Sequence, residues 1–387
     1  MDEPVVIVSV DTHVGPRLVE DLRPYCTPEH LDDFDRYVAA RKRPVRSMPE
    51  IGRHPNQRTA GHYDHAARMA DYDRDGVTAG VIFHGSQNGE PIPFSDGKLA
   101  TSTPAALEFT GVGRRIYNRW LADFVSEAPE RHVGLAQLPM WDPEQAVAEL
   151  IRAADEGLTG VNFPVVQDGI PEYNLPEWDT FYSVCEERRL PLVTHVTAGL
   201  HSKTRYDGPG GLAVSVHENT GWLSRRAIWW LIFGGVFERH PGLKLVMTET
   251  PGTWWLPTAL ELESVYDLMT GNSAAFAELV PRRPTEYMTE HVFFGASGAS
   301  AHEAQQAVDR GIDGNLLWGS DYPHLEGTFV YSEDPDMPSV TKLSLRNTFC
   351  AIPEEAARRM VGLNAVDVYG LDGAALAAVA ARIGAPT

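Results

Sequence analysis

The chain has 387 residues, with 53 Asp and Glu against 33 Lys and Arg, which gives a formal net charge of −20 at pH 7. A hydrophobic fraction of 43% and a charged fraction of 22% are typical of a folded protein with a large buried core. The surplus of negative charge repels phosphate backbones and anionic membrane surfaces. The composition therefore argues against nucleic acid or a membrane as the main partner, and we expect a small-molecule substrate.

Nothing in the sequence predicts export or membrane insertion. The stretch Met1–Pro4 lacks the basic region of a signal peptide, and the longest nearly uninterrupted apolar run, Ala227–Phe237, is too short to span a bilayer. The three cysteines, Cys26, Cys185 and Cys350, are widely spaced and form no CxxC pair, which argues against a disulfide framework or a thiolate zinc site. We therefore expect a cytoplasmic enzyme.

Short apolar segments alternate with amphipathic segments from one end of the chain to the other. The apolar segments predict strands at Val5–Val10, Ala79–Phe83, Val133–Leu138, Gly160–Phe163, Leu192–His195, Leu245–Thr248, Val292–Phe294 and Leu316–Gly319. The amphipathic segments predict helices at Pro143–Glu156, Trp178–Arg189, Ser224–Arg239, Leu256–Leu268 and His302–Asp309. In the first of these helices, Pro143 follows Asp142, a favourable pair for a helix start.

Eight strands, each followed by a helix, predict a (β/α)8 TIM barrel of the α/β class. A doubly wound sheet would alternate in the same way, but no GxGxxG follows the first strand. We expect one barrel over residues 1–370 and a helical tail, 371–387, packed on the outside or at a subunit contact. The Pro-, Gly- and Arg-rich segments 17–62 and 199–216 are too long for minimal loops, so we expect them to fold over the C-terminal mouth as lids.

Acidic and imidazole side chains stand where four of the predicted strands end. Asp11 and His13 follow the first strand two residues apart and so share a face, His195 ends the fifth, Glu249 follows the sixth, and Asp321 follows the eighth. The carboxyl ends of the strands of such a barrel converge on one axis. Two imidazoles with three carboxylates suit Zn, Mn or Fe, so we predict a site for a divalent metal ion.

Four further residues are candidates for the same region. His217, after the fifth strand, would be a sixth metal donor, which leaves open whether the site holds one ion or two; the alternative is a structural pair with Glu218. His84 ends the second strand, and His324 lies three residues past the last carboxylate, so both are candidates for substrate binding. Trp222 belongs to a group of tryptophans expected in the core or at a subunit contact, and at the mouth it would indicate a bulky, apolar substrate.

Several sequence blocks together resemble the amidohydrolase-related family, in the branch of the metal-dependent hydrolase superfamily that includes aminocarboxymuconate-semialdehyde and resorcylate decarboxylases. The blocks are Asp11-Thr12-His13, Tyr63–Met69, Asp73–Val77, Gly235–Lys244, Trp318–His324 and Asn364-Ala365. The resemblance implies a TIM barrel with metal ligands at Asp11, His13, His195 and Asp321. It also implies a homo-oligomer, of which a dimer is the simplest form.

The chain departs from that family at three positions. It has Asp-x-His at residues 11–13 where the prototypes have His-x-His, no lysine in the fourth strand, and Glu249 where the decarboxylases carry a proton-donating histidine. We predict Glu249, Asp321 and His195 as catalytic residues and expect hydrolysis of a bulky, largely apolar, carboxylate- or thioester-bearing metabolite by a metal-activated water. A non-heme iron or di-iron monooxygenase on the same barrel is the alternative, and non-oxidative decarboxylation is third.

Overall fold

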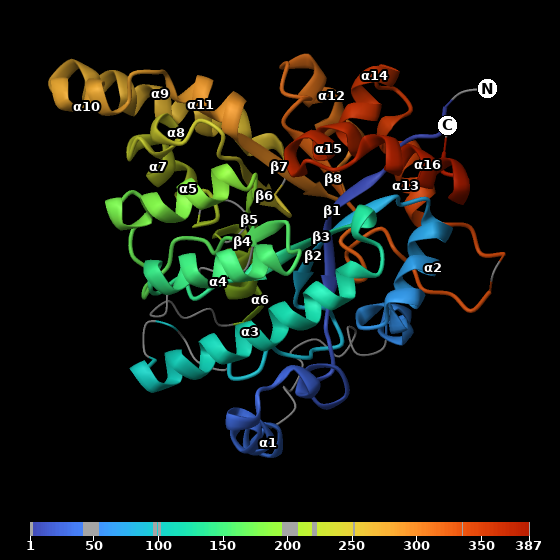
Figure 1. Ribbon diagram of the computed structural model, residues 1–387. Helices are drawn as coiled ribbons and strands as arrows, with labels where there is room; N and C mark the ends of the chain where they lie inside the picture. The colour runs from blue at the N-terminus through green and yellow to red at the C-terminus, as the bar shows by residue number, and fades with distance from the viewer. Residues whose placement is uncertain are drawn as a thin grey trace.

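The computed structural model describes residues 3–41, 54–95, 99, 102–195, 208–218, 223–250, 252–334 and 336–386. Within these residues, eight parallel strands form one sheet in the order β1 to β8, each paired with the next along the chain (Figure 1). The strands are β1 Val8–Val14, β2 Ala79–His84, β3 His132–Gln137, β4 Gly160–Asn162, β5 Leu192–His195, β6 Leu245–Thr248, β7 Val292–Ser297 and β8 Leu316–Gly319. The predicted (β/α)8 barrel is confirmed.

Hydrogen bonds between β1 and the residues that directly follow β8 close the barrel at its C-terminal end. The His13 amide donates to the Tyr322 carbonyl over 2.6 Å, and the Ser320 amide donates to Ser9 Oγ over 2.9 Å. Thr12 and Tyr322 form a parallel bridge at the same place. The end of β1 and the segment after β8 carry Asp11, His13 and Asp321, and these hydrogen bonds fix the two segments to each other.

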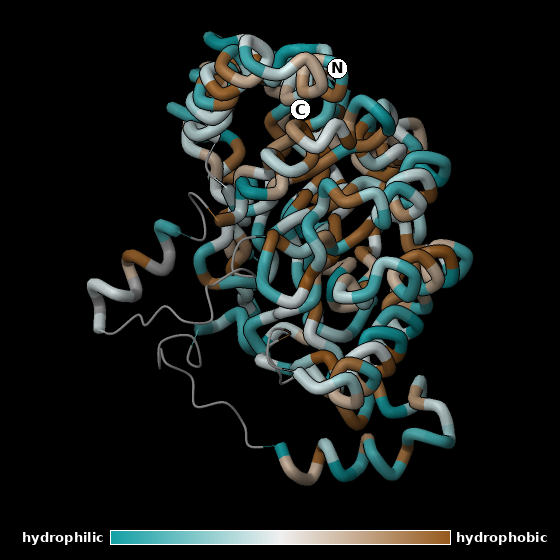
Figure 2. The backbone as a smooth tube through the Cα atoms, turned by 90° about the vertical axis from the view of Figure 1, so that its left-hand side faces the viewer, coloured by the Kyte–Doolittle hydropathy of each residue, from teal (hydrophilic) through white to brown (hydrophobic). Residues whose placement is uncertain are grey.

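Helices surround the barrel (Figures 1 and 2). Their bounds are α1 Leu31–Ala40, α2 His65–Asp75, α3 Pro104–Ser126, α4 Pro143–Asp155, α5 Asp179–Glu187, α6 Gly208–Glu218, α7 Arg226–Phe233, α8 Val236–Arg239, α9 Trp255–Asn272, α10 Ala274–Leu279, α11 Pro284–His291, α12 Ala301–Asp309, α13 Val340–Phe349, α14 Glu354–Arg358, α15 Asn364–Tyr369 and α16 Gly373–Ile383. None of the described helices has both the length and the apolar composition needed to cross a bilayer. Asp142 caps α4 as predicted, since its carboxylate accepts from the Gln145 amide.

The buried side chains form two layers. One fills the inside of the barrel and includes Val8, Val10, Val81 and Leu135, while the other lies between the strands and the surrounding helices. All of the named side chains are completely inaccessible to solvent. The barrel is thus a packed core, and its chemistry is confined to the mouth where the polar residues begin.

Strand β1 differs most from its predicted bounds. It begins at Val8 and runs through the polar Asp11-Thr12-His13 to Val14, although the sequence placed its end at Val10. The ladder with β2 continues through His13 opposite Phe83, with an irregularity between Ser9 and Thr12. His13 is consequently held by backbone pairing within the strand, whereas Asp11 lies in the irregular stretch between the two paired parts of β1.

The segments expected to be lid loops contain helices. Residues 17–62 include α1 and several single helical turns, and residues 208–216 belong to α6; the intervening 42–53 and 199–207 lie outside the described residues. Near the mouth, the Asn56 side-chain amide donates to the Pro323 and Phe329 carbonyls over 3.0 and 2.9 Å, which ties the end of the first segment to the loop after β8.

A glycine pair divides the helix predicted at 224–239 into α7 and α8. Gly235 adopts a φ of +65°, a backbone conformation that disfavours residues with a side chain. The tail forms the helix α16, whose Leu376 is buried in the same cluster of apolar side chains as Val8 and Val81.

Candidate active site

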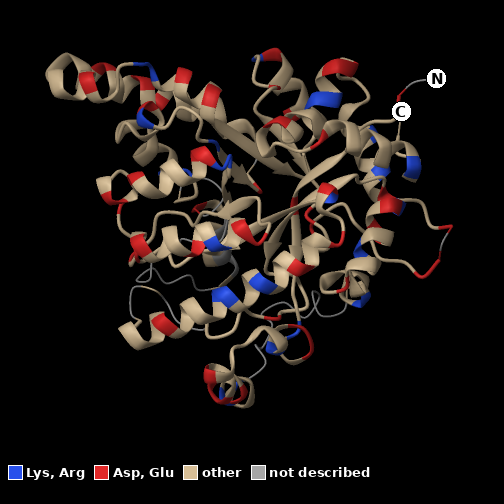
Figure 3. Cartoon of the chain, viewed as in Figure 1, with Lys and Arg blue, Asp and Glu red and all other residues tan. Residues whose placement is uncertain are grey.

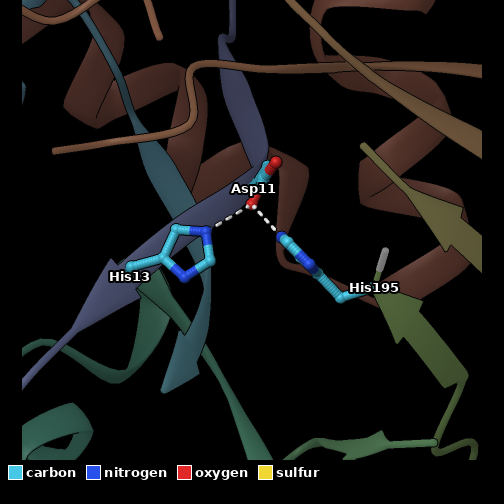
Figure 4. A group of neighbouring side chains, drawn as sticks. All are labelled: Asp11, His13 and His195. Atoms are coloured by element: carbon cyan, nitrogen blue, oxygen red, sulfur yellow. Dashed lines mark ion pairs between the residues drawn. The ribbon is translucent and has the colours of Figure 1, made fainter. Parts of the chain in front are cut away.

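Asp11 stands between two imidazoles at the centre of the barrel mouth (Figure 4). Its Oδ1 lies 3.1 Å from His13 Nε2 on the same strand and 3.5 Å from His195 Nε2 at the end of β5. Its Oδ2 accepts a hydrogen bond from Ser297 Oγ at the end of β7. Asp11 and His13 alternate with Thr12 on β1, so both side chains face the interior while the threonine points outward.

Asp321 supplies a second carboxylate on the other side of His13. Its Oδ1 lies 3.2 Å from His13 Nε2 and 3.0 Å from His324 Nδ1. The His324 ring stacks on the His13 ring with centroids 4.0 Å apart, and its Nε2 lies 3.2 Å from the Gly85 carbonyl oxygen. His324 therefore bridges the ends of β8 and β2 and restricts both Asp321 and His13.

Glu249 is the third carboxylate, one residue past β6. Its Oε2 lies 3.5 Å from His195 Nε2. Both Glu249 and Asp321 have positive φ angles, 58° and 52°, which few residues other than glycine adopt. Such backbone strain clusters at functional sites, where the surrounding structure holds it in place.

The electrostatics of this group favour a positive charge at its centre. Burial alone would lower the pKa of His13, but hydrogen bonds and the charges of Asp11 and Asp321 raise it to about 10. Burial alone would raise the pKa of Asp11, yet His195 and His13 bring it well below its ordinary value. Burial among other carboxylates raises the pKa of Glu249 to about 7, against the opposing effect of His195.

The carboxylate oxygens at the centre of this group are also free to bind a cation. Asp11 Oδ1 and both carboxylate oxygens of Asp321 are buried and, apart from the contacts with the imidazoles given above, have no hydrogen-bond donor among the described residues. Ligand atoms within 4.8 Å of one another form three groups, which are Asp11, His13 and His195; His13, Asp321 and His324; and Glu249, Asp321 and Glu326. Because these groups share residues, one continuous polar surface runs across the mouth from β1 to β8.

A buried arginine holds the end of β1 from behind. Arg68 on α2 is completely buried and donates to the His13 carbonyl over 2.9 Å, to Thr12 Oγ1 over 2.6 Å and to Tyr72 Oη over 2.7 Å. Its guanidinium also lies over the Tyr322 ring, 4.8 Å from the centroid. Arg68 contacts backbone and aromatic groups around His13 but none of the candidate ligand atoms, so its role is to position them.

The remaining predicted residues occupy different places. His84 lies at the end of β2, with its ring 5.3 Å edge-on to Tyr117 and with a pKa lowered to about 4 by burial and by the charge of His13. His217 is exposed on α6, which stands away from the barrel in Figure 2, and it belongs to none of the three ligand groups found among the described residues. Its role as a ligand stays a prediction. Trp222 lies outside the described residues.

The sequence did not reveal three residues that the fold places here. Ser297 bonds to Asp11 across 286 positions of sequence, Glu326 joins Glu249 and Asp321, and Arg68 secures β1. Ser297 ends β7 in the structure, but the sequence predicts that the strand ends three residues earlier, at Phe294, and so provides no reason to place its hydroxyl at the mouth. Arg68 and Glu326 lie on a helix and in a loop, where an isolated charged residue gives no indication of what it will contact.

Known proteins resemble this chain in sequence and fold. The sequence pattern of the amidohydrolase family matches residues 97–371. The chain belongs to the amidohydrolase family. Among its relatives, the gamma-resorcylate decarboxylase of Rhodococcus jostii is 26% identical over 200 residues, which cover 47% of this chain and 56% of that protein. The 2-amino-3-carboxymuconate-6-semialdehyde decarboxylase of Dictyostelium discoideum is 25% identical over 261 residues, 66% of each chain.

Solved structures of the family share the barrel. The 5-carboxyvanillate decarboxylase of Novosphingobium aromaticivorans, complexed with manganese and 4-hydroxy-3-methoxy-5-nitrobenzoic acid, matches with a TM-score of 0.64 at 15% identity, over 95% of this chain and 96% of that one. The resemblance to the branch of aminocarboxymuconate-semialdehyde and resorcylate decarboxylases is confirmed, and with it membership of a superfamily of metal-dependent enzymes. The matched regions span 56% and 66% of the two sequence relatives' own lengths.

Proposed function

We propose that this chain is a divalent-metal-dependent enzyme that hydrolyses a bulky, largely apolar small molecule bearing a carboxylate or thioester. One observation carries the proposal, which is that Asp11 Oδ1 lies within 3.5 Å of the Nε2 atoms of both His13 and His195 at the barrel mouth. With Asp321 on the other side of His13, these four residues would hold the ion, for which Zn, Mn and Fe are the candidates. The manganese in a solved relative supports a divalent ion of this kind.

A bound divalent ion would supply a water whose pKa is low enough to make it a nucleophile at neutral pH. Glu249 is placed to accept a proton there, because its carboxylate lies beside His195 and on the edge of the ligand group. Asp321 is the second candidate for moving the proton, and His195 orients Glu249. Phe83, whose ring centroid is 4.9 Å from that of His195, gives the site an apolar wall. His84, His324 and Trp222 are proposed to contact the substrate.

Decarboxylation, which the sequence alone placed third, becomes the second candidate because the sequence relatives are named as decarboxylases. It requires Glu249 to protonate the carbon that loses carbon dioxide, in place of the histidine expected at this position. Hydroxylation by two irons is the alternative reaction class, and the overlapping, carboxylate-rich groups around Asp321 would suit it. A homodimer and a cytoplasmic location stay predictions.

Metal content, oxygen uptake and product analysis of the purified protein separate these reactions. One zinc or manganese per chain, with no oxygen uptake and an ester or thioester converted to acid, supports hydrolysis. Release of carbon dioxide instead supports decarboxylation. Two irons per chain with oxygen consumed on turnover would contradict both and establish the oxygenase.

Replacing Glu249 by Gln tests its role within that scheme. As a general base, Glu249→Gln abolishes turnover while the metal content stays at the wild-type value. As a ligand, the same change lowers the metal content. Retention of both turnover and metal would show that Glu249 has no part in the chemistry.

A further inference from the structure

A cavity lies at the opposite end of the barrel from the candidate active site. It has a volume of about 800 Å³ and is bounded by α13, by the segment from α14 to Val361, by Val5 and Ile7 ahead of β1, and by Pro386 near the chain end. Figure 1 shows both termini beside this group of helices. Since Asp11 and His13 lie towards the other end of β1, this cavity does not belong to the mouth.

The walls of the cavity are mainly apolar. Ile7, Leu345, Phe349, Ile352 and Val361 line it, and each of them is buried. Leu343, at the rim, remains 50% exposed. Pockets of roughly 300–1,000 Å³ with walls of this kind hold small organic ligands. The cavity therefore has the size and surface needed for a hydrocarbon chain.

Two positive charges stand together on one side of this apolar surface. Lys342 and Arg346 are four residues apart on α13, and so lie on the same face of the helix, and both line the cavity. Over the described part of the chain, neither side chain forms an ion pair or a side-chain hydrogen bond. Arg358, also at the cavity, is by contrast held by Glu354 at 2.8 Å and by the Glu3 carbonyl at 2.9 Å.

This arrangement is unusual for so acidic a chain, in which 53 Asp and Glu face 33 Lys and Arg. We propose that the cavity binds an amphipathic organic anion, whose carboxylate lies between Lys342 and Arg346 and whose unbranched hydrocarbon chain packs against Leu345, Phe349 and Val361. A carboxylate would give both cations a counter-charge, since the acidic residue that also lines the cavity, Glu354, is paired with Arg358. The hydrocarbon chain would cover the apolar walls, which a polyanion would leave unused. The site is independent of the reaction at the mouth.

Cys350 provides a reporter for this site. It is the exposed cysteine at the cavity, whereas Cys26 and Cys185 are buried. The experiment titrates the full chain with decanoate by calorimetry and measures Cys350 alkylation by iodoacetamide using mass spectrometry. We expect one decanoate per chain, slower alkylation in its presence, and weaker binding of decan-1-ol, which has the same chain without the charge.

Replacing both Lys342 and Arg346 by Gln should raise the Kd for decanoate by about five- to tenfold, because each exposed ion pair contributes modestly. Arg310→Gln is the matched control, since Arg310 is an exposed arginine at the end of α12 and does not line this cavity. The proposal is overturned by an absence of saturable binding, or by equal affinity for decanoate and decan-1-ol. A stable dimer in which Cys350 is already unreactive would also overturn it, because a second copy would then cover the cavity.

Discussion

Replacing Arg68 by Met tests how the candidate ligands are held in place. The side chain is buried, and its nearest described partners are uncharged, namely the His13 carbonyl, Thr12 Oγ1 and Tyr72 Oη. Methionine fills a similar elongated volume but donates no hydrogen bond. The change therefore removes the attachment between α2 and the end of β1 without placing a new polar group in the core.

The expected loss of stability follows from these contacts. A hydrogen bond from a charged donor contributes about 1.5–3 kcal/mol, and a buried acceptor left without a partner costs about 1–3 kcal/mol. The variant loses three such hydrogen bonds, but it no longer has to bury a charged guanidinium, which offsets part of that loss. We therefore expect a net fall of about 4 kcal/mol in the free energy of unfolding. An unfolding entropy of about 2.1 cal/mol/K per residue gives about 0.8 kcal/mol/K for 387 residues, and hence a fall in Tm of about 5 °C.

Thermal unfolding at a fixed scan rate and metal content after dialysis measure the two consequences. We expect Arg68→Met to lower both, because His13 depends on this anchor for its position. Arg119→Met on α3 is the control, since the Arg119 side chain is partly exposed and forms no hydrogen bond or ion pair with the residues that the structure describes. If Arg68→Met matched the wild type in Tm and in metal content, the account of Arg68 as the positioning residue for His13 would be wrong.

Two further predictions concern stability. Burial lowers the pKa of both His65 and His132, whose Nε2 atoms lie 3.1 Å apart. The unfolded chain therefore binds more protons than the folded chain at acidic pH. The free energy of unfolding should consequently fall as the pH drops below about 6.5. Urea unfolding at several pH values measures this fall, which His132→Gln should flatten; an unchanged slope would refute it. A Cβ on Gly362 would lie 2.0 Å from the Val6 carbonyl oxygen, so Gly362→Ala should destabilise the fold by about 2 kcal/mol or more. The control Gly271→Ala, in open space on α9, should be neutral or stabilising in the same urea titration, and equal effects of the two changes would contradict the packing argument.

The strands of the barrel could be predicted from the sequence because they are buried on both faces. Leu192–His195, Leu245–Thr248 and Leu316–Gly319 have the predicted bounds, because each begins with two or more buried apolar residues in succession. The end of β1 could not be predicted in this way, since Asp11-Thr12-His13 has the polarity of a loop. It becomes a strand through pairing with residues 82–84, a contact about 70 positions away.

The grouping of the five candidate ligands could be predicted, because each stands at a strand end and the barrel topology brings the strand ends together. These residues are Asp11, His13, His195, Glu249 and Asp321. The residues that hold these ligands in place could not be predicted in the same way. Whether Arg68 faces solvent or the back of β1 depends on how α2 packs, and local sequence does not determine that packing. The helix α1 in the predicted lid was missed for a similar reason, because Phe34 is its one buried residue among mostly polar neighbours.

The most direct test of the central claim is the metal content of the wild type and of Asp11→Asn, each purified without added metal. Asn keeps the size of the side chain but removes the negative charge that lies between His13 and His195. The account predicts at least one divalent ion per wild-type chain and a loss of most of it, together with activity, in the folded variant. A wild-type protein that is active without a divalent ion, or an Asp11→Asn variant with full metal content, would contradict it.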